Sequence, residues 1–113
     1  MSELEEIAQR RRKAHEKLLS MKSKVYEAFL DMERAAFSNG ALAKKDKESI
    51  AVGISVVINC KSCMQWHIEQ VAKAGASEKE MLEAIEVAME MGGGPATVSA
   101  RFALEVLESV FRR

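Results

Sequence analysis

The chain has 113 residues, 48% of them hydrophobic and 30% charged, and its 17 basic and 17 acidic side chains cancel to a net charge of zero. A neutral balance gives no electrostatic footprint for nucleic acid or for an anionic membrane, so we expect neither as a partner. The length fits one domain, and residues 1–113 are predicted to fold as a single unit.

The N-terminal residues and the apolar runs of the sequence indicate no signal peptide and no membrane span. Residues 1–13 are strongly charged and lack the apolar centre of a signal peptide. The longest apolar run, 50–58, is shorter than the roughly 18 residues that a transmembrane helix needs. We therefore expect a cytoplasmic protein, where ordinary thiols are kept reduced. In that compartment the two cysteines indicate redox or metal chemistry rather than a structural disulfide.

Strong helix formers dominate the first third of the chain. Apolar residues between positions 18 and 36 recur at steps of three and four, which is the period of one helix face. The pattern predicts one long helix, or two helices with a break near 20–23, reaching about Phe37. Asn39 and Gly40 then provide a stop signal.

The segment Lys44–Asn59 contains an almost continuous apolar run rich in β-branched residues. Such a run fits either a buried strand or a helix that is buried on all sides. We favour a helix, because no other segment offers a partner strand that would satisfy the backbone of a lone strand. Asn59 or Cys60 then begins another helix, which is expected to run to Ala74 and to end at Gly75.

The last third of the chain has clear start and stop signals. The sequence Ser77-Glu78-Lys79-Glu80 is a capping box that starts a helix, and 92–95 (Gly-Gly-Gly-Pro) breaks it. A final helix follows, so the whole chain is predicted to be all-α with five to six helices. The apolar face of the final helix is wide for so small a domain, which favours an oligomer interface.

Cys60, Cys63 and His67 carry the most distinctive chemistry. On a helix their spacing is i, i+3, i+7, which places all three on one stripe with Cys63 and His67 one turn apart. Both cysteines would lie in the first turn, where free N–H groups stabilise a thiolate and lower the pKa of a thiol from its usual value of about 8.5. The imidazole can accept the thiol proton or hold the thiolate, and the two sulfurs can close a disulfide. The segment therefore predicts a two-electron thiol redox site.

Two other interpretations of these residues exist. Two cysteines and a histidine could be three ligands of zinc, but a structural zinc site needs four, and the remaining histidine, His15, is distant in sequence. Alternatively, both cysteines could be buried beside a core histidine. We expect neither a metal nor a cofactor at the site.

With Glu48 included, the motif resembles the alkylhydroperoxidase D-like branch of the carboxymuconolactone decarboxylase superfamily. That pattern is a glutamate twelve residues before C-x-x-C, a histidine four residues after the second cysteine, and then Gly-Ala-Ser/Thr with acidic residues. This chain matches it with Glu48, Cys60, Cys63, His67 and 75–78. The resemblance covers about a third of the chain directly, and its combined spacing is far more specific than C-x-x-C alone.

The resemblance implies an all-α fold that assembles as dimers, trimers or hexamers, and the activity of a peroxiredoxin-type alkyl hydroperoxide reductase. Cys63 would attack the hydroperoxide, Cys60 would resolve the product to a disulfide, and His67 with Glu48 would relay protons. An external dithiol or a disulfide reductase would donate the electrons. The best-known peroxidases of this family have a second histidine between the cysteines. Ser62 stands there in this chain, which keeps a general dithiol–disulfide oxidoreductase or redox sensor as the alternative.

A carboxymuconolactone decarboxylase-like activity is the third candidate. It is disfavoured, because superfamily members that decarboxylate or open lactones generally lack the cysteine pair.

Other features have simpler interpretations beside their functional ones. By spacing alone, Glu48 could be a solvated residue near a helix start. Trp66 adjoins the motif and could line a substrate pocket, although a core or interface role fits as well. The basic run Arg10–Lys13 lies among acidic residues and is expected to be a solvated helix face.

Overall fold

Five helices account for most of the chain, as the sequence predicted. The computed structural model describes residues 1–112, and within this range it contains no strand. The helices are α1 (Glu3–Ser20), α2 (Lys24–Ala36), α3 (Lys44–Val57), α4 (Lys61–Lys73) and α5 (Glu78–Phe111). The all-α fold class is therefore confirmed.

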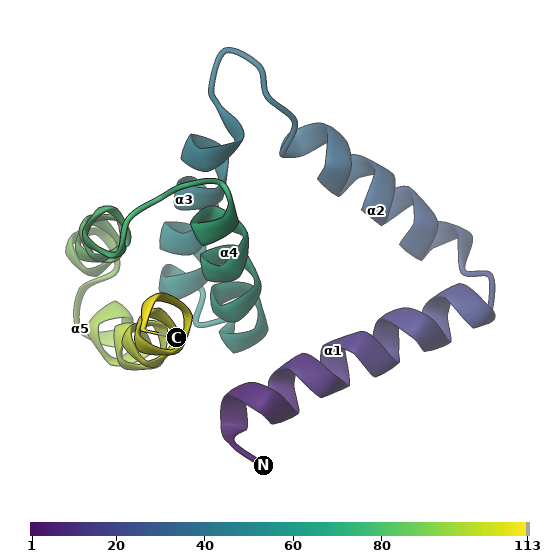
Figure 1. Cartoon of the computed structure of the whole chain (residues 1–113), viewed down its shortest axis with the longest axis horizontal. Helices are drawn as coiled ribbons and strands as arrows, with labels where there is room; N and C mark the ends of the chain where they lie inside the picture. Colours follow the sequence, from purple (N-terminus) through teal and green to yellow (C-terminus); the bar gives the residue numbers. More distant parts are fainter. Residues whose placement is uncertain (113) are drawn as a thin grey trace.

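The core is built from α3, α4 and α5, which pack against one another (Figure 1). Each of the three helices places apolar residues at steps of three and four on the face that meets the other two. The largest fully buried apolar side chains are Val52 and Val56 from α3, Met64, Ile68 and Val71 from α4, and Met81, Ile85 and Val106 from α5. This cluster fixes the relative positions of α3 and α4, the two helices that carry the predicted site.

The apolar run in α3 is helical, as expected, but it is not buried on all sides. Val52 and Val56 are fully buried, whereas Ile50 and Ile54 are about half exposed, at 52% and 55%. The reason is geometric: α3 packs against α4 and α5 with one face, and within residues 1–112 no other helix packs extensively against α3. The expectation of an entirely buried helix was therefore wrong.

The α5 helix contains the predicted break. Gly93 has φ 68° and ψ −149°, so the helix is interrupted there and resumes with Pro95 in the first turn of the second part. The start of α5 is the predicted capping box, in which Ser77 Oγ accepts from the Glu80 N–H and Glu80 Oε1 accepts from the Ser77 N–H. Between these two signals, the first half of α5 packs along α3.

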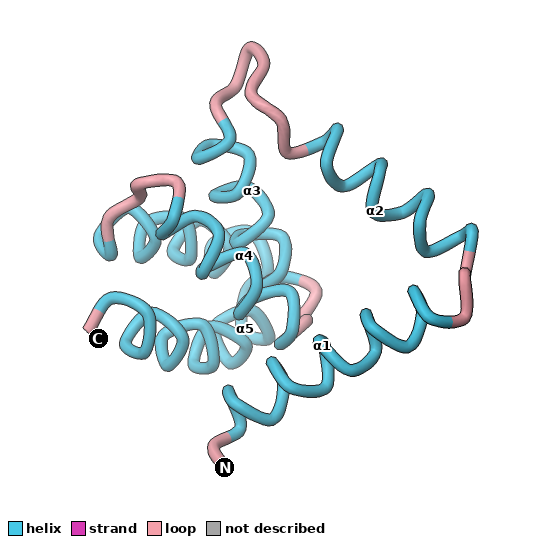
Figure 2. Tube along the Cα trace, turned by 45° about the vertical axis from the view of Figure 1, so that its right-hand side comes forward, coloured by secondary structure: helices cyan, strands magenta, loops and turns pink. Residues whose placement is uncertain are grey.

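An N-terminal arm, formed by α1 and α2 (residues 3–36), extends from the core and returns to it (Figures 1 and 2). Lys22, with φ 54°, turns the chain between the two helices, within the predicted break at 20–23. Neither helix contains a fully buried residue. The arm explains why the radius of gyration is 14.5 Å, above the value of about 13 Å typical of a domain of this length. No helix in the described part of the chain is long and apolar enough to cross a bilayer.

Candidate active site

Cys60 and Cys63 lie at the beginning of α4 and are joined by a disulfide, with their Cα atoms 5.2 Å apart. Asn59, in the left-handed conformation with φ 55°, turns the chain sharply between α3 and α4. Cys60 is the N-cap residue, and its Sγ accepts a hydrogen bond from the Cys63 N–H at 3.3 Å. Both side chains are partly buried. The sulfur pair therefore lies among backbone N–H groups that have no partner within the helix.

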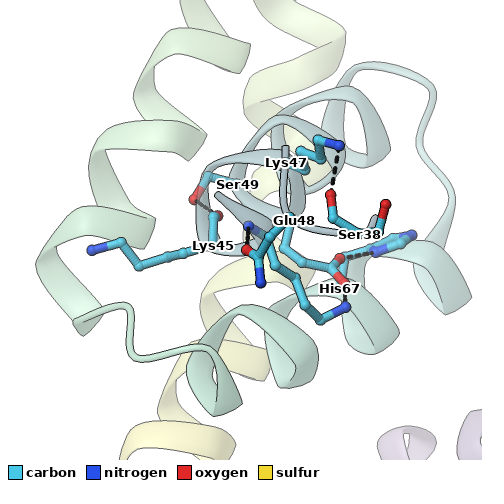
Figure 3. Close-up of polar contacts among 8 residues, drawn as sticks. Ser38, Lys45, Lys47, Glu48, Ser49 and His67 are labelled. Atoms are coloured by element: carbon cyan, nitrogen blue, oxygen red, sulfur yellow. Dashed lines mark hydrogen bonds and ion pairs between the residues drawn. The ribbon is translucent and has the colours of Figure 1, made fainter. Parts of the chain in front are cut away.

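Glu48 lies in the second turn of α3 and is almost completely buried, with 2% of its surface exposed. Its Oε1 lies 2.6 Å from Nδ1 of His67, and its Oε2 lies 3.1 Å from Nζ of Lys44 (Figure 3). An ionised carboxylate only accepts hydrogen bonds, so Nδ1 of His67 is the donor in this pair. The interpretation of Glu48 as a solvated residue was wrong, because the packing of α3 against α4 removes it from water.

The His67 ring is held on a second side by an aromatic contact. Phe37, the residue that ends α2, lies with its ring centroid 5.1 Å from that of His67. The Lys44 Nζ lies 5.7 Å from the centroid of the same Phe37 ring. A shallow pocket of about 180 Å³ opens here and is lined in part by Phe37, Lys44, Glu48 and Trp66. The pocket adjoins the buried Glu48, but neither His67 nor either cysteine is among the residues that line it.

Arg11 connects the N-terminal arm to the cysteine motif. Its Nη1 donates to Ser62 Oγ at 3.2 Å, to the Ser62 carbonyl at 3.5 Å and to Gln65 Oε1 at 3.0 Å. The guanidinium carbon lies 5.2 Å from the centroid of the Trp66 ring, which is a cation–π distance. The prediction of a solvated face for Arg10–Lys13 is wrong for this member of the run, which is partly buried, while the other three are exposed.

Trp66 borders a second pocket on the side of the arm. This pocket has a volume of about 380 Å³ and lies between α1, α2 and α4, and its lining includes Arg11, Tyr26 and Phe29. His15 Nδ1 and Tyr26 Oη, 2.5 Å apart, form its polar wall. Trp66 therefore lines both pockets, and 37% of its surface is exposed, so it is not a core residue of the single chain.

The four residues selected from the sequence come from two neighbouring helices. Glu48 and His67 are in direct contact, and the cysteine pair lies on the same helix as His67, with Cys63 one turn before it. Lys44, Phe37 and Arg11 were not predicted. Lys44 precedes Glu48 by four residues, so an ion pair along one helix could have been anticipated. The contacts of Phe37 and Arg11 join distant segments, and no local signal indicates them.

Among residues 1–112, no group of three or more His, Cys, Asp and Glu side chains is arranged to hold a metal ion.

Known proteins are similar to this chain in sequence and in architecture. The sequence model of the carboxymuconolactone decarboxylase family matches residues 23–106. "Uncharacterized protein 4 in cox locus" of Paracoccus denitrificans is 38% identical over 84 residues, which are 74% of this chain and 76% of that protein. The crystal structure of apo-lpg0406, a carboxymuconolactone decarboxylase family protein from Legionella pneumophila, superposes with a TM-score of 0.91. It is 31% identical, and the match covers 97% of this chain and 98% of that one.

A second solved structure adds a functional description. TM1620 from Thermotoga maritima, described as a carboxymuconolactone decarboxylase family protein with a possible involvement in the antioxidative response, superposes with a TM-score of 0.83. It is 29% identical, and the match covers 92% of this chain and 88% of that one.

Proposed function

This chain belongs to the carboxymuconolactone decarboxylase family, and from its site we propose that it is a thiol-dependent peroxidase that reduces hydroperoxides. The observation that carries the proposal is a disulfide-forming cysteine pair one helical turn from a histidine whose ring is held by a buried carboxylate. The similar Thermotoga maritima protein is described as "possibly involved in antioxidative response", which supports this activity.

Cys63 is the proposed attacking thiol, because it is the cysteine one turn from His67. In the reduced protein, the first turn of α4 favours the thiolate, which is the nucleophilic form of sulfur. The Cys63 sulfur attacks one peroxide oxygen, the O–O bond breaks, and the product is a sulfenic acid plus an alkoxide. The alkoxide takes a proton and leaves as the alcohol.

His67 and Glu48 are the proposed proton relay. Because the carboxylate of Glu48 accepts from Nδ1, the nitrogen Nε2 is the one that takes the thiol proton and returns it to the leaving alkoxide. The carboxylate fixes the tautomer of His67 and stabilises its protonated form, as in other pairs in which a carboxylate orients a catalytic histidine.

Cys60 completes the cycle as the resolving thiol. Its sulfur attacks the sulfenic acid of Cys63, the disulfide forms, and water leaves. An external dithiol then reduces the disulfide and is itself oxidised to a disulfide, which restores both thiols. The net reaction converts a hydroperoxide and a dithiol into an alcohol, water and a disulfide.

A second candidate is a general dithiol–disulfide oxidoreductase or redox sensor. It is favoured by Ser62, which stands between the cysteines where the best-known peroxidases of the family have a histidine. In this case the same disulfide forms, but a protein or small-molecule disulfide is the oxidant. A lactone-opening or decarboxylating activity would not use the cysteine pair.

The decisive experiment is the intact mass of fully reduced protein after brief mixing with a few equivalents of an organic hydroperoxide. The proposal expects a rapid loss of two hydrogens in the native chain, no such loss in Cys63→Ser, and a gain of one oxygen in Cys60→Ser. Oxidation at the slow rate of ordinary free thiols would exclude the peroxidase and leave the disulfide carrier. An unreactive protein that holds stoichiometric metal would instead support the zinc interpretation.

A further inference from the structure

The residues between and just after the two cysteines are held by α1. Lys61 Nζ pairs with Glu3 Oε2 at 2.8 Å, and Gln65 Nε2 donates to the Leu4 carbonyl at 2.7 Å. Arg11 then reaches Ser62, which lies between the two cysteines and directly before Cys63. The arm, which has no buried residue of its own, thus makes its closest polar contacts with the redox motif.

The guanidinium of Arg11 is hydrogen-bonded to uncharged groups of the motif. All three hydrogen bonds of its Nη1 go to uncharged oxygens, two on Ser62 and one on Gln65. Burial lowers the pKa of the Arg11 guanidinium below its ordinary value, the nearby Glu69 acts in the opposite direction, and the charge of Arg12 lowers this pKa further. An arginine keeps its charge at physiological pH, so a partly desolvated positive charge lies against the loop of the disulfide.

Two other charged side chains at the motif, Lys61 and Glu48, are already in ion pairs. Lys61 is bound to Glu3 from α1, and Glu48 from α3 is held by Lys44 and His67. From α5, the ring of Phe102 lies under the Lys61 ammonium and brings no charge to the site. Arg11 is therefore a cation that contacts the segment between the cysteines and whose hydrogen bonds to the motif involve no carboxylate.

We propose that Arg11 is a positioning residue that raises the reduction potential of the Cys60–Cys63 couple by stabilising its thiolate form. The disulfide is neutral, whereas its two-electron reduction with one proton gives a thiol and a thiolate. A fixed positive charge in a partly water-excluded place therefore stabilises the reduced state more than the oxidised state. The same charge favours the attacking thiolate at neutral pH. This inference rests on the redox use of the cysteine pair proposed above, but not on peroxide as the substrate.

The test is the equilibrium of the full chain with glutathione redox buffers, read as the fraction of disulfide by intact mass. Arg11→Gln should stabilise the disulfide about tenfold, which is ~30 mV lower in potential for a two-electron couple. Arg11→Lys keeps the charge and should stay within about threefold of the native chain. Arg10→Gln, an exposed neighbour on the same helix, is the matched control for the loss of one positive charge and should not move the equilibrium.

A second readout is the pH profile of Cys63 alkylation in the reduced protein, which should shift to higher pH in Arg11→Gln and remain in place in Arg11→Lys. A merely structural role would lower the melting temperature of Arg11→Gln without moving either the potential or the profile, and that result would overturn the inference. An equal shift in Arg10→Gln would overturn it as well, because the effect would then be net charge alone. If Arg11→Gln does not fold, Ser62→Ala, which removes one anchor of the guanidinium, should give a smaller shift in the same direction. No shift in that variant counts against the inference.

These measurements use no peroxide. A native chain that reacts slowly with hydroperoxide, but whose potential depends on Arg11, would reject the peroxidase and retain this role.

Discussion

Glu48 is a carboxylate held out of water, and a buried charge is unfavourable unless it is paired. Lys44 and His67 provide the pairs, but a buried ion pair is weak support for stability, because apolar residues of similar volume often serve as well. A charge at this position is therefore better explained by its effect on the His67 ring than by a contribution to stability. A neutral neighbour would hold the ring in place without stabilising its protonated form.

Glu48→Gln separates these two effects. The amide oxygen still accepts from Nδ1 of His67, so the ring keeps its orientation, but the imidazolium loses its counter-charge. Under the proposed mechanism, oxidation of Cys63 by hydroperoxide slows by about 10²-fold, the lower limit for loss of general acid–base catalysis. Single-turnover mass measurements give the rate. Lys44→Gln, which removes the other partner of the carboxylate, is the matched control and should slow the reaction much less.

Some residues of the site could be predicted from the sequence and others could not, for reasons that differ from residue to residue. Cys63 and His67 lie within one helix and Cys60 is its N-cap residue, so their mutual geometry follows from helical spacing and the position of the cap. The link from Glu48 to His67 crosses between helices and came from a family resemblance rather than from periodicity. Arg11 looked like one member of a solvated basic run, because nothing local indicates contacts with a residue fifty-one positions away.

At the scale of elements, helix ends were the most predictable features and helix surroundings the least. The Ser77 cap and the break at 92–95 depend on local backbone chemistry, which short sequence motifs encode. The environment of α3 depends on what packs against it. A run of apolar residues indicates that a helix is removed from water, but not whether the residues that bury it belong to the same chain. Ile50 and Ile54 are about half exposed, so they are not fully buried by their own chain.

Gly93 offers a direct test of the break in α5. Its φ of 68° with ψ of −149° lies in a region that is essentially restricted to glycine, and no atom lies within 4 Å of a Cβ placed there. Gly93→Ala should therefore lower the free energy of unfolding by about 1–3 kcal/mol through backbone strain alone. Urea unfolding with the disulfide intact measures it. Gly94→Ala, which also has open space around the new Cβ but lacks a positive φ, should leave the free energy unchanged or raise it by up to about 1 kcal/mol. Equal losses in both variants would contradict the explanation by strain.

The start of α5 should make stability depend on pH in the acidic range. The pKa of Glu80 is lowered from its ordinary value of 4.5, first by the hydrogen bond from the Ser77 backbone N–H and then by Lys45. A carboxyl whose pKa is lower in the folded state contributes stability above its unfolded pKa, and loses it as the pH falls through the folded value. The difference in unfolding midpoint between the native chain and Glu80→Gln should therefore shrink as the pH falls below 4.5.

The comparison needs a glutamate of the same helix away from the cap. Glu90 is exposed, so Glu90→Gln is the control variant, measured in parallel urea titrations at each pH. If both variants lose their difference from the native chain over the same pH range and to the same extent, the cap is not the origin of the effect.

At the scale of the whole molecule, one chain leaves a large apolar surface uncovered. A groove of about 590 Å³ between α3 and the first half of α5 is lined by Ile50, Ile54, Val57, Val87 and Met91, among others. Each of these five side chains is between 46% and 75% exposed. Contiguous apolar surfaces of this kind are uncommon on monomeric soluble proteins. The sequence pointed to an excess of apolar surface but placed it on the final helix, whereas the structure concentrates it on α3 and the first half of α5.

We expect this groove to be covered by a second copy of the chain, because an isologous contact lets one self-complementary patch bury itself twice. Light scattering coupled to size-exclusion chromatography should then give a mass of at least two subunits for the native chain. Ile54→Asp places a charge at the centre of the groove and should shift the equilibrium strongly towards the single chain, since a buried unpaired charge is highly unfavourable. Leu42→Asp, which changes a comparably exposed apolar residue in the loop before α3, should leave the mass unchanged.

A native chain that elutes as a monomer at high concentration would reject the expectation. If both variants dissociate, the interface lies elsewhere or includes the loop, and if neither does, this groove does not hold the subunits together.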